Sequence, residues 1–140
     1  MIIFPDSYSD ILLLYAVGLA TFFIIDMVWL GVVAKKFYAK EMEGLLAPTV
    51  RWNSAILFYL LYVAGIIVFA VLPALYTQKL VVAPVLGGLY GFFTYMTYDL
   101  TNRATLIRWP MKLVIVDIAW GVIISAIVAM SVYSAHFVIL

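Results

Sequence analysis

Three acidic residues, Asp26, Asp99 and Asp117, lie inside segments that are otherwise strongly apolar. A charged aspartate at the centre of a membrane helix costs about 2.5–3.5 kcal/mol on insertion scales, so such residues usually face the bundle interior and have a partner. Intramembrane carboxyls that gain and lose a proton are also the usual element of proton coupling. The three positions are therefore candidate sites for a proton or a ligand.

The neighbours of the three acids divide them into two kinds. Arg103 follows Asp99 by four residues in the favourable orientation, so a structural ion pair is the simpler expectation for Asp99. Asp26 and Asp117 have no basic residue three or four positions away. They could be neutral and hydrogen-bonded to a tyrosine, an asparagine or an indole N–H, or paired with Arg103 across the bundle. For these two acids we favour a functional role over a purely structural one.

Aromatic and polar residues at similar depth complete the candidate site. The predicted ligand-binding or proton-binding residues are Asp26, Trp29, Asn53, Tyr98, Asp99, Asn102, Arg103, Asp117 and Trp120. Helical spacing puts aromatic or small residues on the face of each acid, a pattern that ordinary packing also produces. The steps Asp26–Trp29 and Asp117–Trp120 are both D-x-x-W, but two shared identities do not establish an inverted repeat.

Composition places these acids in a membrane protein. The chain has 140 residues, of which 68% are hydrophobic and only 11% are charged, whereas a soluble domain carries about 25% charged residues. The apolar runs are continuous and do not alternate, which indicates helices rather than a β-barrel. At ~20 residues a span, we expect one all-α domain over residues 1–140, an up-down bundle of four transmembrane helices. The predicted spans are residues 11–34, 53–72, 80–102 and 111–134.

The connection after the first span contains an apolar face at helical spacing. Its members are Tyr38, Met42, Leu45 and Leu46. This pattern predicts a short amphipathic helix in the membrane interface, or equally an extension of the first span into the headgroup region. We expect the second span to end at Pro73.

Gly87 and Gly91 form a GxxxG step in the third span. Such a step lets another helix approach closely, and packing within the chain is favoured here over a dimer seam. Four helices nevertheless leave little room for both a packed core and a ligand cavity. We therefore expect a homodimer, with the third span as its seam.

Basic residues are distributed unevenly between the connections. The first and third connections carry Lys35, Lys36, Lys40, Arg51, Arg103, Arg108 and Lys112. The second connection carries only Lys79. The positive-inside rule then predicts that the first and third connections are cytoplasmic and that both termini lie outside. In that orientation all three acids lie in the cytoplasmic half of the bilayer.

Several segments together resemble a known family. They are Tyr98–Asn102 (YDLTN), Trp109-Pro110, Val116–Gly121 (VDIAWG), the Asp26 to Trp29 step and Trp52-Asn53. The combination resembles a family of small predicted bacterial membrane proteins of unknown function, and the resemblance covers nearly the whole chain. It implies a bacterial inner-membrane protein of four helices, and it implies no activity.

The sequence leaves three functions open. We favour a protein that binds or transports a small solute or lipophilic ion and is coupled to protons. One alternative is a lipid-processing enzyme or enzyme subunit, in which carboxyls do acid–base chemistry and basic residues hold a phosphate. Another is an assembly protein in which the acids only pair helices. The expected partners are membrane lipid, a small-molecule or lipid ligand and a second copy of the chain, with no nucleic acid.

Metal and cofactor chemistry is limited by the residues that the chain contains. It has no Cys and a single His, His136, so neither a cysteine site nor a His-rich metal site can form within one chain. We expect no metal and no cofactor.

Overall fold

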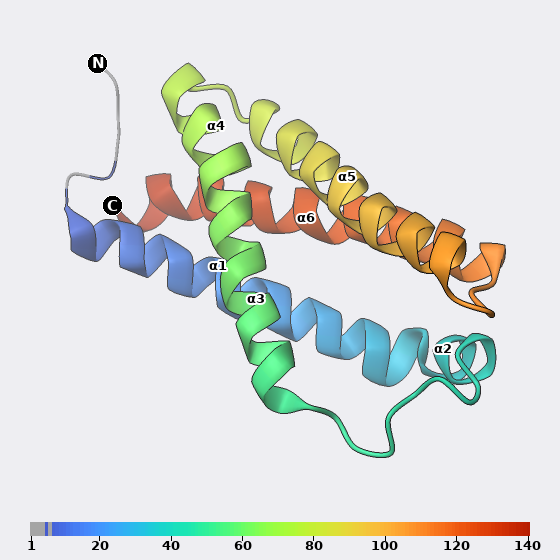
Figure 1. Cartoon of the computed structure of the whole chain (residues 1–140). Helices are drawn as coiled ribbons and strands as arrows, with labels where there is room; N and C mark the ends of the chain where they lie inside the picture. Colours follow the sequence, from blue (N-terminus) through green and yellow to red (C-terminus); the bar gives the residue numbers. More distant parts are fainter. Residues whose placement is uncertain (1–4, 6) are drawn as a thin grey trace.

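The computed structural model describes residues 5 and 7–140, and it consists of helices joined by turns (Figure 1). No strand occurs among the described residues. The first helix begins where Ser7 caps it, because the Ser7 hydroxyl accepts the backbone N–H of Asp10 and the Asp10 carboxyl accepts that of Ser7. The prediction of an all-α chain is confirmed for the part that the structure describes.

Three continuous helices are long and apolar enough to cross a membrane. They are α1 (Tyr8–Val28) with the π-helical turn η1 (Trp29–Val33), α3 (Trp52–Ile66) with η2 (Ile67–Val71) and α4 (Leu72–Thr77), and α6 (Met111–Ile139). The remaining long helix, α5 (Val82–Thr105), has a lower hydropathy because glycines, tyrosines and threonines occupy many of its positions. Three candidate spans are therefore present, and a fourth is not confirmed by length and hydropathy.

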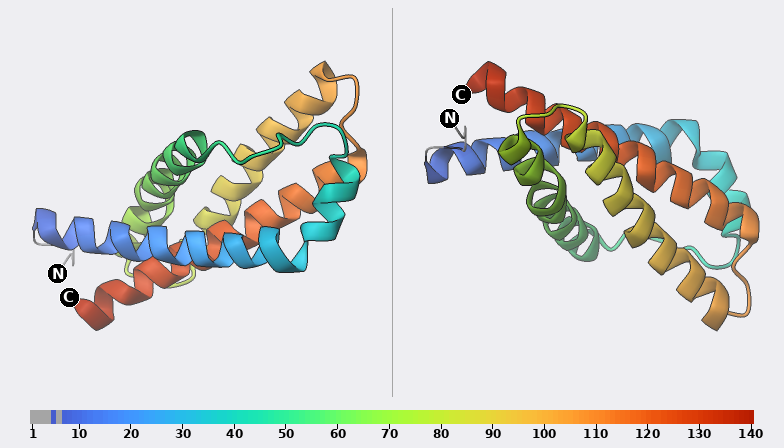
Figure 2. Two further views of the ribbon diagram at one scale, coloured as in Figure 1. Left: turned by 90° about the horizontal axis from the view of Figure 1, so that it is seen from below. Right: turned by 90° about the horizontal axis from the view of Figure 1, so that it is seen from above.

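Helix α6 lies between α1 and α5 and packs against both. Helices α1 and α6 run antiparallel, so that the start of α1 and the end of α6 lie at one end of the molecule (Figure 2). The short helix α2 (Lys35–Glu41) and the turn between α5 and α6 lie at the opposite end (Figure 1). The buried core between these helices contains Phe22, Val63, Ile124 and Val128.

The second span does not end at Pro73, as the sequence analysis expected. The helix continues through this proline to Thr77, and the π-helical turn η2 ends at Val71, just before α4 begins. Proline lacks an N–H and its ring would clash with the carbonyl four residues earlier in a regular α-helix, here that of Phe69. The wider π-helical turn accommodates that clash, so the helix continues past the proline instead of stopping.

Helix α2 confirms a short helix after the first span and overturns the alternative of a straight extension. Ala34, with φ −104° and ψ 5°, interrupts the helical backbone before α2 starts. Tyr38 and Met42 pack on a small core around Trp109 and Leu113. Leu45 and Leu46, also expected on this face, come after the helix and are exposed.

The GxxxG step serves packing within the chain. A Cβ added at Gly91 would lie 2.0 Å from the Gly121 carbonyl oxygen, and one added at Gly87 would lie 2.6 Å from that of Ser125. Both glycines are buried against α6. The expectation that they form a dimer seam is therefore wrong, because α6 of the same chain already occupies that face.

Candidate functional site

Asp26 joins three helices through its carboxyl group. It is only 5% exposed on α1. The Tyr59 hydroxyl on α3 donates to its Oδ2 over 2.8 Å, and the Trp120 indole Nε1 on α6 donates to its Oδ1 over 3.2 Å. Both carboxyl oxygens thus have partners, and both partners are neutral donors.

Asp117 is held in the same way by a residue from outside the spans. The Tyr38 hydroxyl on α2 donates to its Oδ1. The Trp29 indole Nε1 in turn donates to the Tyr38 hydroxyl oxygen over 3.3 Å. Of the alternatives that the sequence left open for Asp26 and Asp117, the structure shows hydrogen bonds to tyrosine and indole groups, whereas Arg103 donates elsewhere, to the Trp109 carbonyl oxygen.

The two carboxyls belong to one network, which we call the carboxyl network: Asp26, Trp29, Tyr38, Tyr59, Asp117 and Trp120. The indoles of Trp29 and Trp120 stack with centroids 4.2 Å apart and planes 8° apart. The tryptophan of each D-x-x-W step therefore interacts with the acid of the other step. Trp120 donates directly to Asp26, whereas Trp29 donates to Tyr38, which in turn donates to Asp117. The antiparallel run of α1 and α6 produces this exchange, because it sets each tryptophan opposite the other helix's acid.

Tyr38 is the member of the network that lies outside the membrane-spanning segments. Burial raises the pKa of its phenol above the ordinary value, and the hydrogen bond to the Asp117 carboxyl raises that pKa further. The hydroxyl therefore keeps its proton at neutral pH and acts as a donor to Asp117.

Asp99 is fully buried on α5 in a separate contact. Its Oδ1 accepts the Trp109 indole N–H over 3.0 Å, whereas its Oδ2 has no partner among the described residues. The Arg103 Nη1 atom donates instead to the Trp109 carbonyl oxygen over 2.8 Å. Within residues 5 and 7–140 no ion pair joins Asp99 to Arg103, so the expected i, i+4 pair is wrong. The turn after α5 brings Trp109 back over the acid.

The structure brings only some of the predicted site residues together. Asp26, Trp29, Asp117 and Trp120 are in the carboxyl network, and Asp99 and Arg103 meet at Trp109. Tyr98 packs edge-on against Trp109, with ring centroids 5.7 Å apart.

Two predicted site residues lie elsewhere. Asn53 is exposed at the start of α3, where its side-chain oxygen accepts the backbone N–H of Ser54 over 2.9 Å. Asn102 is half-buried, and its carbonyl closes the last turn of α5 by accepting the Leu106 N–H. Neither side-chain amide joins the carboxyl network, and that of Asn102 hydrogen-bonds instead to Tyr98, one turn earlier on α5.

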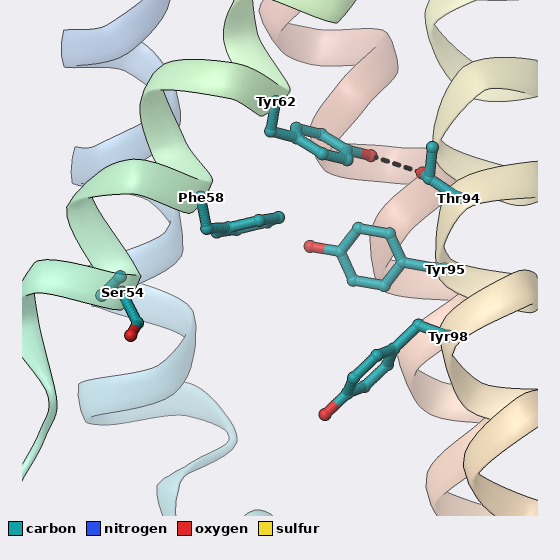
Figure 3. Close-up of a pocket in the computed structure, with 7 residues that line it drawn as sticks. Ser54, Phe58, Tyr62, Thr94, Tyr95 and Tyr98 are labelled. Carbon is teal, nitrogen blue, oxygen red and sulfur yellow. Dashed lines mark hydrogen bonds between the residues drawn. The ribbon is translucent and has the colours of Figure 1, made fainter.

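A pocket of about 600 Å³ lies between α3 and α5, close to the network. Its lining residues are Ser54, Ala55, Phe58, Tyr62, Thr94, Tyr95 and Tyr98 (Figure 3). The Tyr62 hydroxyl closes the inner end, where it shares hydrogen bonds with Thr94 over 3.0 Å and with Ser125 over 2.8 Å. We call this space the wedge pocket.

Tyrosines are the members of the candidate site that the sequence analysis did not include. Tyr59 and Tyr38 hold the two acids, and Tyr62 and Tyr95 line the wedge pocket. Their hydroxyls inside or beside apolar segments were a usable signal, because a buried hydroxyl needs a partner. Residue spacing alone does not identify the hydrogen-bond partner of a tyrosine hydroxyl when that partner lies on another helix.

The fold and the site define a small helical membrane protein with buried carboxyls held by tyrosines and tryptophans. Within the described residues no three His, Cys, Asp or Glu side chains gather as a metal site would require. Residues 11–134 match the model of the family described as "Predicted membrane protein (DUF2177)", so the chain belongs to this family of unknown function. No curated protein and no solved structure matches the chain.

Proposed function

We propose that the protein binds and transports a small solute or lipophilic ion in exchange for protons, and that Asp26 and Asp117 carry the exchange. The observation behind this proposal is that both acids share one partly buried network whose donors are all neutral. Burial penalises two uncompensated negative charges, so a proton or a cationic ligand is favourably bound there.

The proposal includes α5 as a fourth span. At 1.5 Å per residue, a helix of 24 residues is about 36 Å long, which exceeds the ~30 Å hydrocarbon core. Helix α5 also packs along α6, a candidate span in its own right. The polar groups that lower its hydropathy include Asp99, which is buried inside the bundle and so is kept from lipid.

The proposed orientation follows the basic residues. Helix α2 with Lys35, Lys36 and Lys40 lies at the same end as the turn that carries Arg108 (Figure 1). We assign this end to the cytoplasm of a bacterium and both termini to the outer side of its inner membrane. Impermeant labelling of single cysteines in whole cells should then react at position 79 and not at position 40.

A homodimer remains part of the proposal, through a surface other than the Gly87 and Gly91 face. Crosslinking in native membranes measures it, and a product of monomer size alone would remove the dimer from the proposal.

The test of the function is proton movement on ligand addition. Purified protein in vesicles with a trapped pH dye would be given a panel of organic cations, organic anions and neutral solutes. At least one member should drive proton release from the parent protein. Asp26→Asn and Asp117→Asn should abolish that release while remaining folded, because asparagine matches a neutral carboxyl in shape. Glu43→Gln, an exposed acid, is the control.

Two results would count against the function. Proton release that survives in both asparagine variants would mean that the network is structural. A parent protein that moves no protons with any panel member would remove the exchange itself.

A further inference from the structure

The wedge pocket exists because α3 and α5 touch at one level and then diverge. At the level of Gly65 the helices are in contact, since a Cβ there would lie 2.0 Å from the Tyr90 hydroxyl. Toward the start of α3 and the end of α5 the two helices separate (Figure 1). Tyr62 marks the point of separation, with its ring 5.1 Å from that of Tyr90 and 5.9 Å from that of Tyr95.

Aromatic rings dominate the lining of this space. Figure 3 shows Phe58 on α3 opposite Tyr95 and Tyr98 on α5, with the Tyr95 hydroxyl directed into the gap. The Ser54 and Thr94 hydroxyls add a few polar groups, and none of the lining residues is basic. The volume of about 600 Å³ falls within the ~300–1,000 Å³ of pockets that take drug-sized molecules.

Two buried acids, Asp26 and Asp99, and the partly buried Asp117 act electrostatically on the tyrosines of this pocket. The charge of Asp26 acts on the hydroxyls of Tyr62 and Tyr95, and that of Asp117 acts on Tyr95 and Tyr98. Asp99 also acts on Tyr98. Tyr95 is the link between pocket and network, because its ring lies on Gly121, the residue after Trp120. An ionised carboxyl at any of these three positions therefore favours positive charge in the pocket.

We propose that the wedge pocket binds a monovalent organic cation with a bulky apolar body, and that this cation is the solute exchanged for protons at Asp26 and Asp117. This assignment rests on the proposed function. The rings of Phe58, Tyr62, Tyr95 and Tyr98 hold the apolar body and interact with its charge through their faces. The acids supply the net negative charge, and one proton leaves the network for each cation bound. A hydrated metal ion would find too few oxygen ligands in such a lining.

The experiment uses probes of one shape and opposite charge. Binding of radiolabelled tetraphenylphosphonium to the purified protein in detergent is measured by equilibrium dialysis, beside tetraphenylborate and neutral triphenylphosphine oxide. The cation should bind, and the anion should bind at least tenfold more weakly. Equal binding of the three probes would show a pocket that selects only for apolar surface, and this would overturn the cation assignment.

Matched variants locate the site. Ala55→Trp fills the pocket and should abolish cation binding, whereas Ile56→Trp, at the exposed neighbouring position, should leave it unchanged. Tyr98→Ala should weaken binding roughly tenfold through the loss of one ring face. Phe93→Ala is its control, since Phe93 and Tyr98 lie on the same helix and are 56% and 55% exposed, but Phe93 does not line the pocket. Cation binding that survives both Ala55→Trp and Tyr98→Ala would place the ligand elsewhere.

The failure of this inference can be told apart from failure of the proposed function. If anions or neutral solutes release protons through Asp26 and Asp117 while cations do not, the exchange stands and the ligand class is wrong. If the cation binds in the wedge pocket without releasing a proton, the pocket assignment stands and the exchange is wrong. If Ala55→Trp does not fold, Tyr98→Ala still tests whether the cation binds in the wedge pocket. The Tyr98 side chain is half exposed, so its removal should leave the fold intact.

Discussion

The two halves of α5 pack differently. The first half carries Gly87 and Gly91 against the backbone of α6, with no space for even one added methyl group. The second half carries Tyr95 and Tyr98 along a pocket of about 600 Å³. A single helix therefore forms both a close backbone contact and one wall of a pocket.

The low hydropathy of α5 follows from this double role. Glycines are needed where two backbones approach closely, and tyrosine and threonine hydroxyls are needed where the helix faces other polar groups. Both residue types reduce the apolar content of the span. If this comparison is right, changes in the glycine-bearing first half of α5 should affect stability, and changes in the pocket-lining second half should mainly affect binding.

The largest expected effect is at Gly91. In Gly91→Ala the new Cβ would lie 2.0 Å from the Gly121 carbonyl oxygen, so α5 and α6 must separate, at a cost of about 3 kcal/mol. Thermal unfolding in detergent measures this loss. Gly88→Ala is the control, because its Cβ would lie 3.5 Å from Val122, an ordinary contact. Equal losses at the two positions would show that helix packing here does not depend on the close approach.

A smaller effect is expected at Tyr62, which packs where the two halves of α5 meet. Tyr62→Phe leaves the Ser125 hydroxyl, which is 0% exposed, without its tyrosine partner. An unsatisfied buried hydroxyl costs about 2 kcal/mol. Tyr90→Phe is the matched control, because the Tyr90 hydroxyl makes no side-chain hydrogen bond in the part of the chain described. A melting temperature of Tyr62→Phe equal to that of Tyr90→Phe would mean that the inner end of the pocket is held by ring packing alone.

Long apolar runs made the spans predictable to within a few residues at most of their ends. The predicted first span, 11–34, compares with 8–33 in the structure, and the predicted last, 111–134, compares with an observed helix that extends to Ile139. The expected helix end at Pro73 was wrong because the rule that excludes proline applies to a regular α-helix, and the helix before Pro73 contains a π-helical turn. The π-helical turn and α4 both pack on α5, and hydropathy does not encode that packing.

The candidate site was half predictable for a related reason. Depth along a helix follows from residue spacing, and four of the nine residues grouped on that basis, Asp26, Trp29, Asp117 and Trp120, lie together in the structure. The partner of Asp99 was not predicted, because the i, i+4 rule considers one helix, while Trp109 reaches the acid from the turn after α5. Tyr38 was missed as a site residue for the same reason, since α2 folds back onto α6. The spacing of residues along one helix does not predict contacts that depend on turns and on the angles between helices.

Tyr38 gives a prediction that depends on pH. Its raised pKa means that the folded protein favours the protonated phenol, so this contribution to stability is present below the ordinary tyrosine pKa of about 10 and is lost as the pH rises above it. Tyr38→Phe should cost about 1 kcal/mol at neutral pH through the lost hydrogen bond to Asp117. The gap in melting temperature between parent and variant should narrow from pH 8 to pH 11. A gap that stays constant would show that the phenol titrates alike in folded and unfolded chains.

The smallest effect is expected at Asp99 and Arg103. Asp99→Asn keeps an oxygen to accept the Trp109 indole N–H, so it should cost less than about 1 kcal/mol. Arg103→Gln removes only the donor to the Trp109 carbonyl. Because neither change leaves a buried opposite charge behind, the double variant should melt no higher than the less stable single variant. An ion pair predicts the reverse, since removing both charges would recover stability that removing one had lost. Recovery in the double variant would therefore place Arg103 on the Asp99 carboxyl and not on the turn, and Trp109 would lose its role as the residue that closes this end of α5.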